Sequence, residues 1–117
     1  MHPLDVLLVD DDLDLLSFLS LFIAGRGHTA RTANSLGTAW NEISRQCPDV
    51  IVSDFSIGDE RGDVLLERVF QEHPNVRRIL YTGRMPSHAK EIVDRRIAHR
   101  VILKRIEIDE LFRSIIE

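Results

Sequence analysis

Acidic side chains gather in two groups along this chain of 117 residues. The first group is Asp10, Asp11 and Asp12, and the second is Asp54, Asp59 and Glu60. Carboxylates that are brought together repel one another, and the repulsion costs stability unless a cation compensates it. Mg2+ suits that role, because it prefers oxygen ligands and typically takes one or two carboxylates with waters and a phosphate. The two groups therefore indicate a magnesium site.

Other side chains supply what a phosphoryl-transfer site needs beside a metal. Lys104 carries a compact positive charge on a long stem, which suits a phosphate oxygen or a carboxylate. Thr82 offers a short hydroxyl donor, and Gly83 beside it leaves room for a group on Asp54. A nucleophilic carboxylate, a metal, a cation and a hydroxyl donor together are the parts for phosphoryl transfer to an aspartate.

The elements that must position these side chains alternate along the chain. Short apolar runs that end on polar residues predict strands at 6–9, 50–52, 76–82 and 101–103, and a short Thr-containing segment predicts another at 28–33. Apolar residues at helical spacing predict helices around 15–22, 36–43, 65–70, 89–97 and 108–115. In the first helix this spacing places Leu15, Phe18, Leu19 and Phe22 on the packed face. Trp40 is also expected to pack, far from the acidic groups.

Strict alternation of strand and helix predicts a parallel sheet with helices on both faces, in one domain over residues 1–117. In such α/β sheets, ligands bind at the carboxyl ends of the strands. Four of the five predicted strands end at a polar residue of the proposed site, namely at Asp10 and Asp11, at Asp54, at Thr82 and at Lys104. We therefore expect one shared site at this edge.

Composition excludes several other classes of protein. Asp and Glu outnumber Lys and Arg by 19 to 15, for a formal charge of −4, which argues against a nucleic-acid surface. The pairs Arg77-Arg78 and Arg95-Arg96 are expected on solvated faces. No apolar run approaches the roughly 18 residues of a membrane span, and no signal peptide is evident. With the lone Cys47, which fits a reducing compartment, these features predict a cytoplasmic protein that does not bind membranes.

Over essentially its whole length, the chain resembles the receiver domains of two-component signalling. The family marks are an acidic pair after the first strand, Asp after the third, Thr or Ser after the fourth and Lys after the fifth. The corresponding segments here are Val-Asp10-Asp11, Ser-Asp54-Phe, Tyr-Thr82-Gly and Leu-Lys104-Arg, and Gly62 occupies the family's glycine position eight residues after the aspartate. The resemblance implies a CheY-like, flavodoxin-like (βα)5 fold with strand order 2-1-3-4-5.

The resemblance also implies how the metal is held. Asp54 and Asp11 would ligate Mg2+ directly, together with the backbone carbonyl of Ser56. Asp10 would act mainly through a metal-bound water. Mg2+ binding should therefore depend more on Asp11 than on Asp10.

The remaining implied roles concern the phosphoryl group. Asp54 would be the phosphoacceptor, Thr82 would donate a hydrogen bond to a phosphoryl oxygen, and Lys104 would pair with Asp54 or its phosphate. The donor would be a phosphohistidine on a sensor histidine kinase or a histidine phosphotransfer protein. A homodimer or an attached effector domain would deliver the output. Such a domain is not an enzyme beyond catalysing its own phosphorylation and dephosphorylation.

Three positions depart from the family pattern. Gly58 and Arg105 stand where proline is usual, and Val101 replaces the aromatic residue that turns inward in many members. The peptide bond before Arg105 is therefore expected to be trans, since a cis bond before a non-proline residue costs about 2.5–4 kcal/mol. The signal is expected to leave through the loop at 83–87 rather than through Val101.

Two alternatives belong to other classes. A degenerate receiver could bind proteins without being phosphorylated. The three departures give this alternative some support, but the presence of Asp10, Asp11, Asp54, Thr82 and Lys104 argues against it. A small phosphatase that forms an aspartyl-phosphate would need a second acid two residues after its nucleophile, where this chain has Ser56.

Overall fold

The computed structural model describes residues 2–104 and 108–117, so Arg105 and the peptide bond before it lie outside the described residues. Within them, a parallel five-stranded sheet has the order β2-β1-β3-β6-β7. The strands are β1 (Asp5–Val9), β2 (Thr29–Ala33), β3 (Val50–Ser53), β6 (Arg77–Thr82) and β7 (Arg100–Leu103). In chain order this arrangement is 2-1-3-4-5, which confirms the predicted fold.

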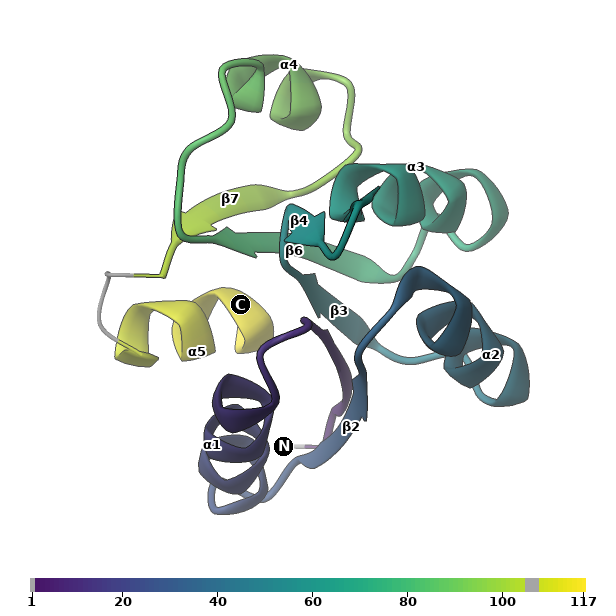
Figure 1. Ribbon diagram of the computed structural model, residues 1–117. Coiled ribbons are helices and arrows are strands. Elements are labelled where there is room, and N and C mark those ends of the chain that lie inside the picture. The colour runs from purple at the N-terminus through teal and green to yellow at the C-terminus, as the bar shows by residue number, and fades with distance from the viewer. Residues whose placement is uncertain (1, 105–107) are drawn as a thin grey trace.

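Helices cover both faces of the sheet, as Figure 1 shows. On one face lie α1 (Leu13–Ala24) and α5 (Ile108–Ile116); on the other lie α2 (Leu36–Arg45), α3 (Gly62–Glu72) and α4 (Ala89–Asp94). Alternate strand residues point to opposite faces. In β1, for example, Val6 and Leu8 pack toward α1 and α5, whereas Leu7 and Val9 pack toward α2 and α3. The continuous apolar run of this strand is thereby buried on both sides.

Capping side chains fix where the first two helices begin. The Asp12 side chain accepts a hydrogen bond from the Leu15 backbone N–H (3.1 Å) and caps α1. Ser35 and Thr38 form a reciprocal capping box at the start of α2. These caps orient each helix as it leaves the carboxyl end of its strand.

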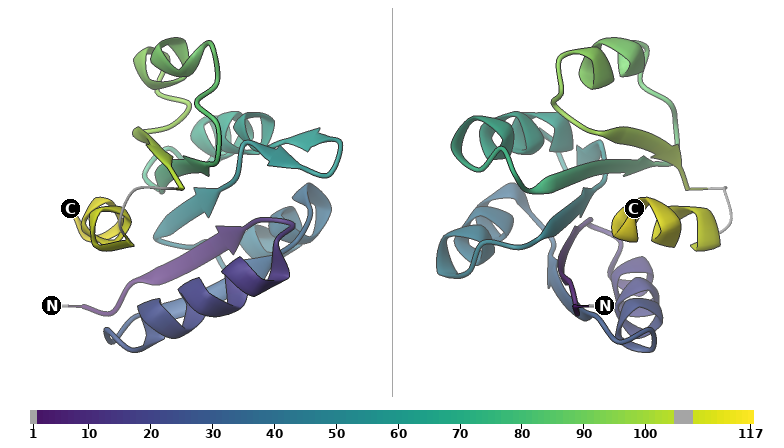
Figure 2. Two further views of the ribbon diagram at one scale, coloured as in Figure 1. Left: turned by 60° about the vertical axis from the view of Figure 1, so that its left-hand side comes forward. Right: turned by 180° about the vertical axis from the view of Figure 1, so that it is seen from behind.

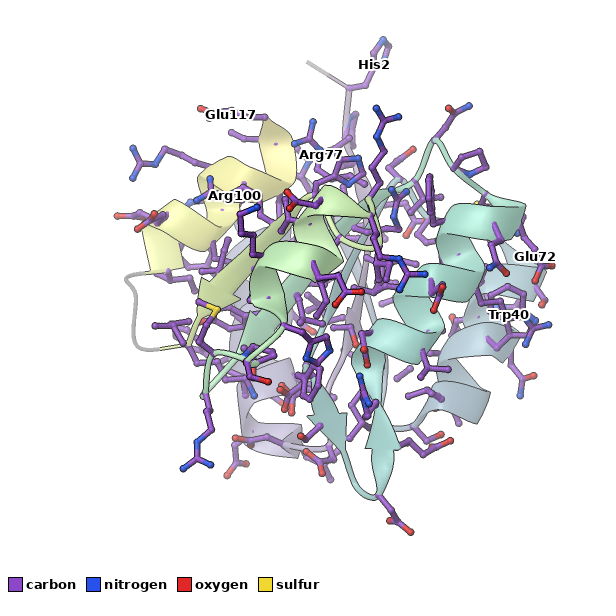
Figure 3. The ribbon with its side chains drawn as sticks, turned by 90° about the horizontal axis from the view of Figure 1, so that it is seen from above. His2, Trp40, Glu72, Arg77, Arg100 and Glu117 are labelled. Atoms are coloured by element: carbon purple, nitrogen blue, oxygen red, sulfur yellow. The ribbon has the colours of Figure 1, made fainter. Side chains whose placement is uncertain are left out.

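The packed face of α1 differs in part from the prediction: Leu19 is buried and Leu15 packs against the core as predicted, but Phe18 does not. The helix buries Leu16, Leu19 and Ile23, whereas Phe18 is 55% exposed. Apolar residues occur almost all round this helix, so their spacing could not select one face, and contact with the sheet decided it. Trp40, in contrast, packs against the core as predicted: it is half-buried, lies under the guanidinium of Arg68 and is seen beside α3 in Figure 3.

A short hairpin follows Asp54. The described residues form antiparallel strands β4 (Ser56–Ile57) and β5 (Glu60–Arg61), which stand out from the end of the sheet in Figure 2. Gly58 has φ +60°, at the first position of a two-residue loop, where a type II′ turn favours glycine. Ile57 is 2% exposed and anchors the hairpin to the core.

Candidate functional site

The carboxyl ends of the parallel strands bring the predicted site residues together. Asp10 directly follows β1, Asp54 follows β3, and Lys104 follows β7. Backbone hydrogen bonds continue the sheet past these ends: Asp54 N donates to the Val9 carbonyl (2.9 Å), and Lys104 N donates to the Thr82 carbonyl (2.8 Å). The side chains are therefore held by regular strand pairing.

Lys104 lies between two of the carboxylates. Its Nζ is 2.7 Å from Asp10 Oδ2 and 3.0 Å from Asp54 Oδ2. Burial disfavours the positive charge of Lys104, but the hydrogen bonds and charges of the two aspartates outweigh this effect and raise its pKa. Lys104 is therefore a permanent cation of the site at neutral pH.

Asp10 is the buried member of the acidic group, with 5% of its surface exposed. Burial raises its pKa, and the neighbouring charge of Asp54 acts in the same direction. The hydrogen bonds from Lys104 and from the Asp12 backbone N–H (2.9 Å) lower it by less. The ionised form of Asp10 is thus held at a cost, which an added cation would reduce.

The acidic group meets the requirements of a hard divalent cation. Asp10, Asp11 and Asp54 each offer a carboxylate oxygen, and these oxygens lie within 4.8 Å of one another. Among the described ion pairs, Lys104 binds Asp10 and Asp54, and its single charge leaves the group of three carboxylates with an excess of negative charge. Oxygen ligands with excess negative charge fit Mg2+. Ser56 lies in β4 and is exposed; its predicted contact with the metal stays a prediction.

Asp11 has a partner that the sequence did not indicate. Its Oδ2 accepts a hydrogen bond from the backbone N–H of Gly58 in the hairpin (2.9 Å). Proline, the usual residue of the family at position 58, has no N–H to donate. The departure from proline was the signal that could have indicated this contact, which fixes one carboxylate oxygen and leaves the other for a ligand.

Thr82 makes a hydrogen bond within its own loop, and two glycines near the site differ in how much space surrounds them. Thr82 is 4% exposed, and its hydroxyl donates to the Arg84 carbonyl (3.1 Å) within the following loop. A Cβ at Gly83 would meet no atom within 4 Å, which agrees with the predicted free space. A Cβ at Gly62 would lie 1.8 Å from the Asp54 carbonyl oxygen, so glycine is required there.

A cluster behind Asp54 connects the hairpin to two helices, and sequence reasoning missed it. Asp63 in α3 is 7% exposed and accepts hydrogen bonds from the Arg61 guanidinium, with Nε at 3.0 Å. His88, immediately before α4, places Nε2 3.1 Å from Arg61 Nη2, and its ring lies 5.7 Å from that of Phe55. Because Phe55 follows Asp54, the cluster couples the site loop to the start of α4.

Residues 6–116 match the sequence model of the response regulator receiver domain. The chain belongs to this family. Receiver domains serve as switches in two-component signalling, and the family uses Mg2+ at an acidic pocket like the one formed here. Among the described helices, none has the length and apolar character needed to span a bilayer.

Curated relatives agree with this assignment. The receiver is 29% identical over 109 residues to the nitrogen assimilation regulatory protein NtrX of Azorhizobium caulinodans, covering 92% of the chain and 24% of NtrX. It is 33% identical over 97 residues to the probable transcriptional regulatory protein TcrX of Mycobacterium tuberculosis, covering 83% of the chain and 39% of TcrX. The chain thus spans less than half the length of either relative.

A solved structure supports the fold independently. A CheY-like receiver domain protein from Methanospirillum hungatei superposes with a TM-score of 0.90 at 22% identity, over 97% of this chain and 91% of that one. The receiver fold observed here is therefore shared with a protein of low sequence identity.

Proposed function

We propose that this receiver takes a phosphoryl group onto Asp54 from a phosphohistidine of a sensor histidine kinase or a histidine phosphotransfer protein. Phosphorylation then changes which partners the domain binds. The position of Lys104 supports this proposal most strongly, because its Nζ lies within hydrogen-bonding distance of both Asp54 and Asp10. The neighbouring carboxylates of Asp10, Asp11 and Asp54 offer the oxygen ligands that a metal ion in this transfer requires.

The transfer forms one bond and breaks another. An oxygen of Asp54 attacks the phosphorus atom, the bond from phosphorus to the donor imidazole nitrogen breaks, and that nitrogen leaves with the electron pair. Lys104 shifts its hydrogen bond from Asp54 toward a phosphoryl oxygen and offsets negative charge there. Asp11, Asp54 and the Ser56 carbonyl would hold Mg2+ directly, with Asp10 acting mainly through a metal-bound water, and the ion would supply further positive charge there. The Thr82 hydroxyl leaves the Arg84 carbonyl and donates to the phosphoryl group.

We also propose how the receiver acts in its pathway. It acts on no substrate beyond its own aspartyl group, and its output passes through a homodimer or an effector domain. Because the chain spans under half of NtrX and TcrX, the activities of those proteins do not transfer to it directly. A cytoplasmic location stays a sequence-based prediction.

Labelling with acetyl phosphate and Mg2+ tests the assignment. Intact-mass spectrometry should show one added phosphoryl group on the wild type and none on Asp54→Asn. Asp59→Asn is the matched control, since Asp59 is an exposed aspartate of the neighbouring hairpin, and it should be labelled normally. Labelling of Asp54→Asn at the wild-type level would exclude Asp54 as the acceptor.

A second function, a binding module independent of phosphorylation, is favoured by the departures at Gly58 and Val101. It predicts a wild type that neither binds Mg2+ nor accepts phosphate, while still binding a partner. Calorimetric titration with Mg2+ before and after labelling distinguishes the two functions.

A further inference from the structure

A pocket of about 460 Å³ lies at the opposite end of β6 from the phosphorylation site. Its apolar wall is formed by Phe70 in the last turn of α3, by Pro74 after that helix, by Val93 of α4, and by Ala98. Its polar wall is formed by Arg78, Arg96 and His99. Ligand sites commonly have volumes of roughly 300–1,000 Å³, so this pocket is large enough for a small molecule or the end of a peptide.

Arg78 contributes a buried positive charge to the pocket, contrary to the solvated position expected from the sequence. Only 1% of the residue is exposed. Its guanidinium donates to four backbone carbonyls: Nε to Ile97 (3.1 Å), Nη1 to Pro74 (3.1 Å) and Val76 (2.7 Å), and Nη2 to Arg96 (2.9 Å). These carbonyls hold the group in place but carry no net charge. No described carboxylate forms an ion pair with it.

Such an arrangement is unusual, because buried charges are normally paired with an opposite charge. A guanidinium has five N–H groups, and the four bonds to described carbonyls leave one N–H of Nη2 for another acceptor. The Phe70 ring, 4.7 Å away, adds only a quadrupole. Burial lowers the pKa of Arg78, which reflects the same lack of a counter-charge.

Arg96 adds a second positive charge to the lining of the pocket, and His99 adds an N–H donor. The His99 Nδ1 accepts a hydrogen bond from the Arg78 backbone N–H (3.0 Å), so the proton of the neutral ring is on Nε2. Burial and the charge of Arg78 lower the pKa of His99, which keeps the ring neutral near pH 7. The pocket therefore combines positive charge and N–H donors with an apolar wall.

We propose that this pocket binds a carboxylate carried on an apolar body. The carboxylate would accept hydrogen bonds from Arg78 and His99, and the body would pack against Phe70 and Val93. A planar monoanion matches a guanidinium with few free donors better than a phosphate dianion does. The carboxylate can come from a free organic acid or from the carboxyl terminus of a peptide.

An NMR titration with 3-phenylpropionate tests the proposal, with the neutral amide 3-phenylpropionamide as the matched probe. The acid should shift the amides of residues 76–78 and 92–99 in a saturable way at millimolar concentration, and the amide should not. An N-acetylated dipeptide ending in Phe, as free acid and as amide, distinguishes the two sources. Tighter binding of the peptide acid indicates a chain terminus, and tighter binding of 3-phenylpropionate indicates a free acid.

Substitution at the pocket rim supplies a second test that does not remove Arg78, whose loss could unfold the domain. Val93→Trp fills the pocket from a position that is 39% exposed and should weaken binding of the acid by at least about tenfold. Val64→Trp, at a 56% exposed site of α3, is the control and should bind like wild type. Equal shifts with acid and amide, no saturable shift, or full binding by Val93→Trp would each overturn the proposal. None of these results bears on phosphorylation of Asp54.

Discussion

The two ends of β6 carry opposite charge imbalances. At the carboxyl end, near Thr82, the Lys104 ammonium pairs with Asp10 and Asp54, and Asp11 adds a third carboxylate to the group. At the amino end, the Arg78 guanidinium is enclosed by carbonyl oxygens, with Arg96 and His99 beside it. Both groups depend on regular strand geometry for their position. The excess of negative charge at the carboxyl end suits a cation, and the excess of positive charge at the amino end suits an anion. The charge that the fold leaves without a partner therefore decides which ligand each end of the strand can bind.

Removal of Lys104 should have the largest effect on this comparison. Lys104→Met leaves the buried Asp10 without its cation, and loss of one partner of a buried pair should lower the free energy of unfolding by about 2–4 kcal/mol. Urea denaturation in EDTA measures this loss, and added Mg2+ should recover part of it. Lys90→Met is the control, because that lysine pairs with Asp94 on an exposed face. Similar losses in both variants would show that Lys104 does not compensate the acidic group.

Asp10→Asn should act in the opposite direction. Because the folded protein raises the pKa of Asp10, its ionised form lowers stability at neutral pH. The Asn variant should therefore gain about 0.5–2 kcal/mol without metal, in the range of typical stabilising substitutions. Thermal denaturation in EDTA checks this gain, with the exposed Asp59→Asn as control. A less stable Asp10→Asn would mean that the Lys104 contact outweighs the cost of burial.

Gly58→Pro tests the hydrogen bond that orients Asp11. Proline lacks the N–H and cannot adopt φ +60°, whereas Asn keeps the N–H and tolerates left-handed backbone. Calorimetry should show weaker Mg2+ binding by Gly58→Pro than by Gly58→Asn, by on the order of 0.5–1.5 kcal/mol. Equal affinities would indicate that the Gly58 contact does not position Asp11.

The smallest expected effect lies at the basic end of β6. Burial and the charge of Arg78 lower the pKa of His99, so protonation favours the unfolded chain. The contribution of His99 to stability is present above its unfolded pKa of about 6.5 and is lost as the pH falls below that value. His99→Gln should show a shallower decline of stability between pH 7 and pH 5 than wild type in urea denaturation. Parallel declines would exclude His99 as a source of this pH dependence.

Much of the site followed from the sequence, because its residues directly follow apolar runs. Asp10, Asp54 and Lys104 could be placed at one edge once the alternation of strands and helices predicted a parallel sheet. The Gly58–Asp11 bond and the Arg61–Asp63–His88 cluster could not, since they join segments whose contacts no local pattern encodes. The predicted trans bond before Arg105 and the signal route through residues 83–87 stay predictions.

The sequence by itself determined the class of fold and the edge at which the acidic residues meet, because strand ends and helix caps are local features. Only the tertiary structure decided which charged side chains are buried. Arg77 and Arg78 are chemically identical neighbours, yet successive strand residues point to opposite faces of the sheet. Arg77 reaches the end of α5, where it donates to the carbonyls of Ser114 and Glu117 (Figure 3), while Arg78 enters the enclosed side beneath α3 and α4. Burial depends on what covers each face, and those covering segments are distant in the chain.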